Sequence, residues 1–164
     1  VVHDLMQDSY SYKLQAPMGC DFSSGFEPYF TPKEMLDLGV FEGKYCNDCQ
    51  SELPKDWFVN AKMNNVSDPS LNYFGVKSRQ PLSVWLEKGW IIGPDPREWF
   101  QWYCRYFLGR RLSKIDKVQI KRWRSFRRHS AQVQRKTVIL EIVCVDHDNF
   151  RHCCSGRMIH SFEF

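Results

Sequence analysis

The sequence predicts a mostly α-helical, compact single domain of about five helices. Three observations indicate this class. The length of 164 residues suits one domain, apolar residues recur at helical spacing in several segments, and Pro and Gly stand where helices begin and end. We expect residues 1–30 to form an irregular aromatic N-terminal arm, residues 31–136 the helical domain, and residues 137–164 an atypical, β-prone tail.

Three short helices are predicted in the first half of the domain. The Thr31–Glu34 segment has the pattern of a capping box, with a proline at the first helical position, and starts a helix that should end at Gly39. A second helix is expected over residues 53–63. A third is expected over residues 81–88, where Gly89 provides the C-terminal stop.

The most aromatic element is a helix predicted over residues 96–108. Asp95 and Glu98 fit a second capping box at its start, and Gly109 ends it. At 100° per residue, one face of this helix collects Trp99, Trp102, Tyr103 and Tyr106. We expect this face in the core, since the alternative, a stacking platform for a ligand or a base, is rarer. The other side carries Gln101, Arg105 and Leu108.

Basic residues are concentrated in a long helix predicted over residues 114–135. Between Arg110 and Lys136 there are 11 Lys or Arg residues and one acidic residue, whereas the rest of the chain has 12 basic and 18 acidic residues. The apolar side of this helix carries Ile115, Trp123 and Phe126, and the opposite side forms a basic face. Because regularly placed cations release counterions from phosphates, this face is a candidate nucleic-acid-binding site. With the turn before it, the site comprises Arg110, Arg111, Lys114, Lys117, Lys121, Arg124, Arg128 and Arg135.

The sequence is also compatible with two functions other than nucleic-acid binding. The acidic remainder of the molecule indicates that the basic face could instead meet an acidic protein partner or a second copy of the chain. The third hypothesis is an enzyme with a cleft beside the aromatic helix. It is less favoured, because the sequence has no GxSxG, Walker, HExxH or dinucleotide motif, and its catalytic residues are unknown. No sequence signature distinguishes DNA from RNA as the partner.

The cysteines favour an intracellular protein, cytoplasmic or nuclear. There are seven, an odd number that is atypical of a secreted disulfide scaffold. Cys46 and Cys49 have the spacing of half a zinc site, but the second pair is missing, so we expect no metal and no cofactor. A redox role for this pair is less favoured, since no βαβ unit precedes it. No apolar run is long enough for a membrane span, and we expect no membrane partner.

The segment DPREWFQWYCRYFLGRR, followed by QIKRWRSFRRHSAQV, resembles a widespread family of uncharacterised small proteins. Its members carry a DPR-x-WFQWYCRY-x-x-GRR segment and then a basic helix. The likeness covers about residues 29–135 and implies no assigned activity or catalytic residue. The tail from residue 137 departs from the family pattern, so we hypothesise that it arises from a frameshift or a retained intron; an uninterrupted, spliced transcript encoding it would contradict this.

Overall fold

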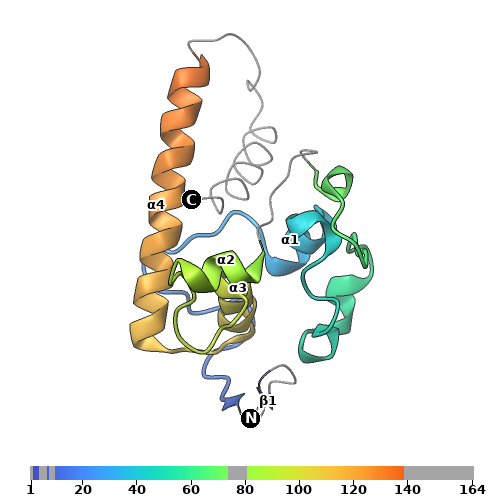
Figure 1. Ribbon diagram of the computed structural model, residues 1–164. Helices are drawn as coiled ribbons and strands as arrows, with labels where there is room; N and C mark the ends of the chain where they lie inside the picture. Colours follow the sequence, from blue (N-terminus) through green and yellow to red (C-terminus); the bar gives the residue numbers. More distant parts are fainter. Residues whose placement is uncertain (1, 4–6, 8–9, 74–80, 139–164) are drawn as a thin grey trace.

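The computed structural model describes residues 2–3, 7, 10–73 and 81–138, without the side chains of residues 2–3 and 126–138. Within this part of the chain, the regular structure is mostly helical, as predicted. Figure 1 shows the α-helices, which are α1 (Pro32–Asp37), α2 (Leu82–Glu87), α3 (Glu98–Leu108) and α4 (Ser113–Val138). Two short strands, β1 (Val2–His3) and β2 (Ser11–Tyr12), pair antiparallel.

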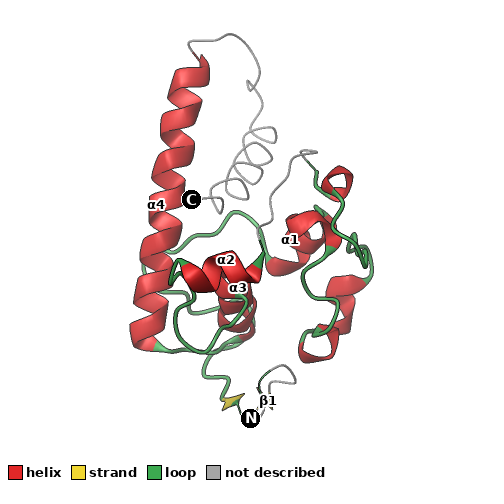
Figure 2. Cartoon of the chain, in the orientation of Figure 1, coloured by secondary structure: helices red, strands yellow, loops and turns green. Residues whose placement is uncertain are grey.

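The helix predicted over residues 53–63 is reduced to a single 3-10 turn, η3 (Lys55–Phe58). The backbone that follows bonds to α1 and to the segment after it instead of to itself. The amide of Lys62 donates to the carbonyl of Leu36 (3.3 Å), and the amide of Asn64 donates to that of Gly43 (2.9 Å). These long-range bonds replace helical ones, so four of the five expected α-helices form. Much of the chain between α1 and α2 is accordingly loop and short 3-10 turns (Figure 2).

The capping box predicted at α1 is confirmed, and the one predicted at α3 is wrong. At α1, the Thr31 hydroxyl accepts from the Glu34 amide (3.2 Å), and the Glu34 carboxylate accepts from the Thr31 amide (2.7 Å). At α3 the N-cap residue is Arg97, and it makes no side-chain capping bond. Asp95 is buried among arginines, and the Glu98 carboxylate turns back to accept from the Ile92 amide (3.1 Å).

The core is an aromatic cluster built between the N-terminal arm, α3 and α4. Phe26 of the arm is 1% exposed, and its ring centroid lies 5.0 Å from that of Trp123 on α4. The same ring makes edge contacts, at 5.5–5.9 Å, with Trp102, Tyr103 and Tyr106 of α3. Edge-on pairs of this kind add to the stabilisation from burial. The prediction that the aromatic face of α3 belongs to the core is therefore confirmed.

Helix α3 is buried on its polar side as well, which the helical wheel did not predict. Gln101 and Arg105 were expected to point outward, but they are 5% and 0% exposed. The segment between α1 and η3 covers this side of the helix. Its Tyr45 hydroxyl accepts from the Gln101 amide (3.1 Å), and its Glu52 carboxylate accepts from Arg105 Nε (2.8 Å). A polar helix face thus becomes an interior surface because matching polar groups cover it.

Helix α4 packs against α3 along one side of the molecule, and its C-terminal half rises beyond α2 and α3 (Figure 1). Among its described side chains, the buried ones are Asp116, Gln119, Ile120 and Trp123, which lie three, four and seven residues after the first of them. The core role expected for Trp123 is thereby confirmed. The helix ends at Val138, two residues into the predicted tail; the rest of that tail lies outside the described residues. No described helix is both long and apolar enough to cross a membrane.

Candidate functional site

Three of the predicted basic residues form one exposed row on the outer side of α4. We call Lys114, Lys117 and Lys121 the lysine face; all three are exposed. Seven residues separate the first from the last, or about 10 Å along the helix axis. Within the described part of the chain, none of the three forms an ion pair with a carboxylate.

The one acidic residue of α4 does not neutralise the lysine face. Asp116 is 5% exposed and points inward. One carboxylate oxygen accepts from Trp102 Nε1 (2.9 Å) and the other from the Leu112 amide (2.6 Å). Burial raises the pKa of Asp116 above its ordinary value, against the lowering effect of these hydrogen bonds. The carboxylate therefore serves the start of the helix and its packing on α3, and leaves the lysines without a local counter-charge.

Two predicted arginines lie at the rim of the lysine face and bind the N-terminal arm. Arg124 is exposed, but its Nη2 donates to the carbonyl of Ser24 (2.8 Å). Arg111 is half-buried, with its guanidinium 3.9 Å from the ring centroid of Tyr106 and 2.7 Å from the carbonyl of Cys20. Both side chains hold the arm in place. Farther along, the α4 backbone carries Arg128 and Arg135 in line with the lysine face, but their side chains lie outside the described residues.

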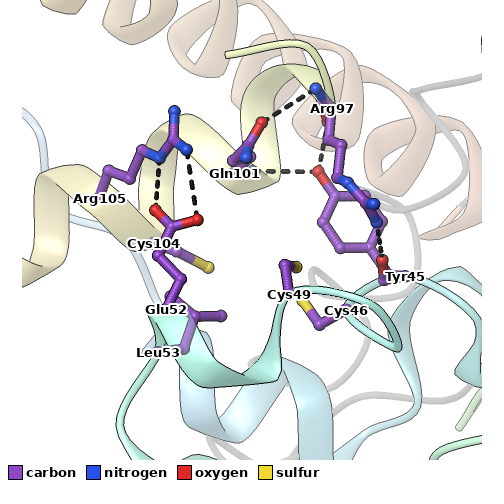
Figure 3. Close-up of a pocket in the computed structure, with 9 residues that line it drawn as sticks. All are labelled: Tyr45, Cys46, Cys49, Glu52, Leu53, Arg97, Gln101, Cys104 and Arg105. Carbon is purple, nitrogen blue, oxygen red and sulfur yellow. Dashed lines mark hydrogen bonds and ion pairs between the residues drawn. The ribbon is translucent and has the colours of Figure 1, made fainter. Parts of the chain in front are cut away.

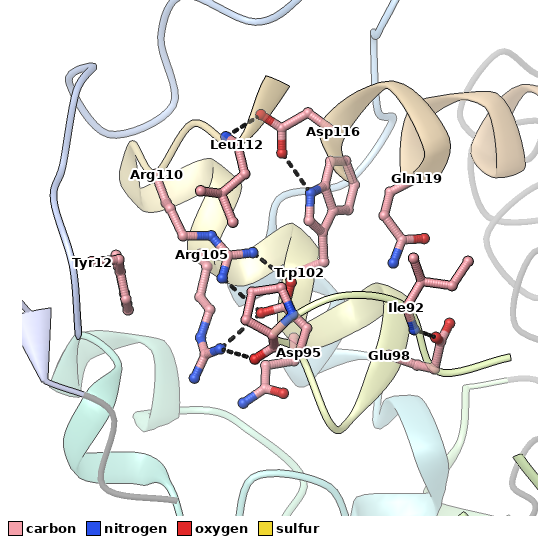
Figure 4. Close-up of polar contacts among 12 residues, drawn as sticks. Tyr12, Ile92, Asp95, Glu98, Trp102, Arg105, Arg110, Leu112, Asp116 and Gln119 are labelled. Carbon is pink, nitrogen blue, oxygen red and sulfur yellow. Dashed lines mark hydrogen bonds and ion pairs between the residues drawn. The ribbon is translucent and has the colours of Figure 1, made fainter. Parts of the chain in front are cut away.

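Arg110 does not belong to this surface, so its predicted place in the basic face is wrong. It is 1% exposed, and its two Nη atoms donate to the two oxygens of Asp95 at 2.7 and 2.5 Å. Arg105 Nη1 donates to the same carboxylate at 2.7 Å, as Figure 4 shows. A guanidinium and a carboxylate form bidentate pairs, which offset part of the cost of burying both charges. The arginine after Gly109 is therefore structural.

A small pocket lies between α3 and the loop that carries Cys46 and Cys49 (Figure 3). Polar side chains converge there, as the enzyme hypothesis requires, but the space is only about 10 Å³, roughly what one water molecule needs. That volume is too small for a metabolite. The lining residues are Tyr45, Cys46, Cys49, Glu52, Leu53, Arg97, Gln101, Cys104 and Arg105.

Three cysteines meet at this pocket. Cys46 and Cys49 come from the loop before η2 (Gln50–Glu52), and Cys104 points toward them from α3 (Figure 3). They are 1%, 4% and 2% exposed. The sequence spacing indicated that Cys46 and Cys49 lie close together. It could not indicate that Cys104 and Arg97 join them, because only the packing of the loop against α3 brings these residues together. Among the described residues, no three Cys, His, Asp or Glu side chains are arranged to hold a metal ion.

The two loop thiols differ in their acidity. A hydrogen bond between the two sulfur atoms lowers the pKa of Cys49, and the positive charge of Arg97 lowers it further, against the opposing effect of burial. The same hydrogen bond, together with burial, raises the pKa of Cys46. Burial raises the pKa of Cys104. Of the three thiols, Cys49 therefore ionises first.

No family model, curated protein or solved structure matches this chain. The family resemblance over residues 29–135 therefore stays a prediction.

Proposed function

We propose that this protein is a nucleic-acid-binding module that contacts phosphates through the lysine face of α4. The observation that supports this most strongly is the exposure of three lysines in one row, with no carboxylate of the described chain paired to them. A lysine held in an internal ion pair would have to lose that partner before it bound a phosphate. Unpaired lysines need only release their own hydration, and each phosphate that they neutralise releases counterions.

The position of the aromatic side chains favours contacts with the nucleic-acid backbone over contacts with bases. Trp123 is 0% exposed and packs against Phe26, so it presents no surface for base stacking. Within the described part of α4, none of the exposed side chains is aromatic; besides the lysines they are Ser113, Val118 and Arg124. Phosphate contacts fix position but carry no sequence information. We therefore expect binding that depends on charge and not on base sequence.

The hypothesis of an acidic protein partner, or of a second copy of the chain, uses the same lysines. It predicts a different behaviour of the purified protein when no nucleic acid is present. The described part of the chain has exposed acidic residues that do not belong to α4, such as Glu27 and Asp56. If the lysine face bound a second copy of the chain, the protein would self-associate at low salt and dissociate at high salt. Size-exclusion chromatography across a salt series separates the two. The nucleic-acid proposal requires the same elution volume at every salt concentration.

The direct test is charge reversal on the lysine face. We expect Lys117→Glu combined with Lys121→Glu to weaken binding to a fluorescent 20-base-pair duplex by at least tenfold at low salt, since two phosphate contacts become repulsive. The readout is fluorescence anisotropy. The matched control is Lys44→Glu combined with Lys55→Glu, which changes the net charge equally at two exposed lysines outside α4.

The control variant should bind within about threefold of the unmodified chain, because it leaves the phosphate contacts intact. Equal losses in both double variants would show that net charge alone drives binding. No loss in either would show that the lysine face makes no contact. Either result would contradict the proposal.

A further inference from the structure

The thiol pocket beside α3 contains none of the residues of the lysine face, and three cysteines and an arginine line it. We propose that Cys46 and Cys49 form a redox-active dithiol that is oxidised by hydrogen peroxide, with Cys49 as the nucleophile and Cys46 as the resolving thiol. This inference is independent of the proposed nucleic-acid-binding function, because no residue is shared between the two sites.

The loop geometry allows a disulfide between the two residues. The Cys49 amide donates to the Cys46 carbonyl at 3.2 Å, which closes a four-residue turn. The ends of such a turn have Cα atoms within about 7 Å of each other, close to the limit at which a disulfide forms without backbone movement. Both thiols are reduced and line the same small pocket. The turn therefore places the two residues within the range of separations at which a disulfide forms.

The surroundings of the pair favour the thiolate on Cys49. Arg97 lines the same pocket and is fixed there by three groups: Nη2 pairs with Asp48, Nη1 donates to the Tyr45 carbonyl, and the backbone amide donates to the Gln101 side chain at 3.0 Å. A fixed guanidinium near a sulfur atom stabilises its negative charge. The charged and titratable groups that act on Cys49 are Cys46, Asp48, Glu52 and Arg97; the two carboxylates oppose the effect of the arginine.

The size of the pocket selects a small oxidant. Cys49 keeps 4% of its surface exposed, and the space beside the three thiols is about 10 Å³. A disulfide such as oxidised glutathione is far larger than this space. Hydrogen peroxide has two heavy atoms and needs only a slight widening of a pocket that admits water. Peroxide is therefore the chemical class of substrate that the geometry favours.

The proposed reaction takes place in two steps. The Cys49 thiolate attacks one oxygen of hydrogen peroxide and the O–O bond breaks; the departing hydroxide takes the proton of the Cys46 thiol and becomes water. This leaves a sulfenic acid on Cys49 and a thiolate on Cys46. The Cys46 sulfur then attacks the Cys49 sulfur, the S–O bond breaks, and the second hydroxide is protonated by solvent. Overall, two thiols and one hydrogen peroxide give one disulfide and two waters, and an added dithiol reverses the oxidation.

The test measures each cysteine of the full, unmodified chain separately. The reduced protein is treated with hydrogen peroxide, the remaining thiols are alkylated at timed intervals, and peptides are quantified by mass spectrometry. We expect Cys46 and Cys49 to be lost together, at least tenfold faster than Cys20, the exposed cysteine of the arm, and to be recovered in one disulfide-linked peptide. Dithiothreitol should restore both. Equal or faster loss of Cys20, or a disulfide between Cys49 and Cys104, would overturn the proposal.

Three variants separate the roles of the two thiols. With Cys46→Ser, the reaction should stop at a sulfenic acid on Cys49, which dimedone traps; with Cys49→Ser, Cys46 should no longer react with peroxide. Cys20→Ser is the matched control and should leave the rate at the pair unchanged. Near-ultraviolet circular dichroism reports whether each variant keeps the aromatic core. Rapid oxidation of Cys46 in a folded Cys49→Ser variant would overturn the assignment of the nucleophile.

The pH dependence gives a second readout. A lowered pKa means that the Cys49 thiolate persists to lower pH than that of an ordinary cysteine. Its alkylation rate in the unmodified chain should therefore reach half its maximum below about pH 8.5, the ordinary value for a cysteine. A midpoint at or above that pH would contradict the role of Arg97 in activating the thiol.

Discussion

At the scale of single residues, the interior of this protein is held by charges as well as by aromatic rings. Asp95 is 0% exposed and accepts from both Arg105 and Arg110, while Glu52 accepts from the remaining side of Arg105. The two guanidiniums and two carboxylates balance in charge. Tyr12 lies with its ring centroid 5.5 Å from each guanidinium. A network of this kind tolerates the loss of one member poorly, because a buried charge then remains without its partner.

Replacement of the shared carboxylate should therefore be costly. We expect Asp95→Asn to lower the free energy of unfolding by about 3–5 kcal/mol, because the buried Arg110 loses its carboxylate partner and Arg105 keeps only Glu52. The loss of unfolding free energy is measured by urea denaturation, from the shift of the midpoint urea concentration between proteins that have the same m-value. The control is Asp56→Asn, which removes a surface pair with Lys33 at 3.9 Å and should change stability by less than about 1 kcal/mol. Equal effects of the two variants would refute the role assigned to Asp95.

At the scale of helices and loops, glycines fix where the helices end and how the arm docks. Gly109 ends α3 with φ +113°, and its carbonyl accepts from the amides of Gln15 (2.8 Å) and Ala16 (3.2 Å). A Cβ at this position would lie 2.0 Å from the Ala16 carbonyl oxygen. Gly89 follows α2 with φ +64°, and a Cβ there would meet nothing within 4 Å. The two glycines thus share a backbone conformation but differ in their surroundings.

Because of this difference, we expect alanine to lower the free energy of unfolding more at Gly109 than at Gly89. Gly89→Ala should cost about 1–2 kcal/mol of unfolding free energy, which is the penalty of a left-handed backbone for a residue with a Cβ. Gly109→Ala should cost at least about 2 kcal/mol more, because the arm must also move away from α3. Thermal unfolding of both variants under the same conditions makes the comparison. A cost for Gly109→Ala no greater than that for Gly89→Ala would contradict the close packing of the arm.

Local patterns predicted the elements well where local interactions decide the structure. Thr31 and Glu34 satisfy each other within one turn, so their capping box was readable from four residues, and the periodicity of α4 placed Trp123 in the core. The predictions that failed concern residues whose partners come from other segments of the chain. Asp95 looked like a helix cap, yet it binds Arg105 and Arg110, whose positions around it depend on tertiary packing.

The candidate sites, too, were predictable where neighbouring residues form them and not where tertiary packing brings distant residues together. The lysine face was predictable because one helix carries all three lysines. Arg110 was wrongly included in the basic face, because helical spacing and charge say nothing about a buried partner on another segment. The thiol pocket was only half predictable. Cys46 and Cys49 share a loop, whereas Cys104 and Arg97 reach them only once that loop packs against α3.

At the scale of the whole molecule, the basic residues are concentrated and the acidic residues are spread out. From Arg110 to Lys136 the chain has 11 basic residues and one acidic residue, and elsewhere acidic residues exceed basic ones by six. Part of the basic charge is used internally, as with Arg110 and with Arg122, which binds Glu98 at 2.6 Å. Among the described side chains of α4, the exposed basic residues are those of the lysine face and Arg124 at its rim. This charge pattern is the basis of the proposal that polyanions approach the molecule from the side of α4.

The salt dependence of nucleic-acid binding tests this account most directly, because it counts the phosphates that the lysine face neutralises. The measurement is the slope of log binding constant against log salt concentration for the unmodified chain, for Lys117→Ala combined with Lys121→Ala, and for Lys44→Ala combined with Lys55→Ala. We predict that the first double variant has a slope less steep by about 2 and that the second keeps the slope of the unmodified chain. The same slope for all three proteins would contradict the account.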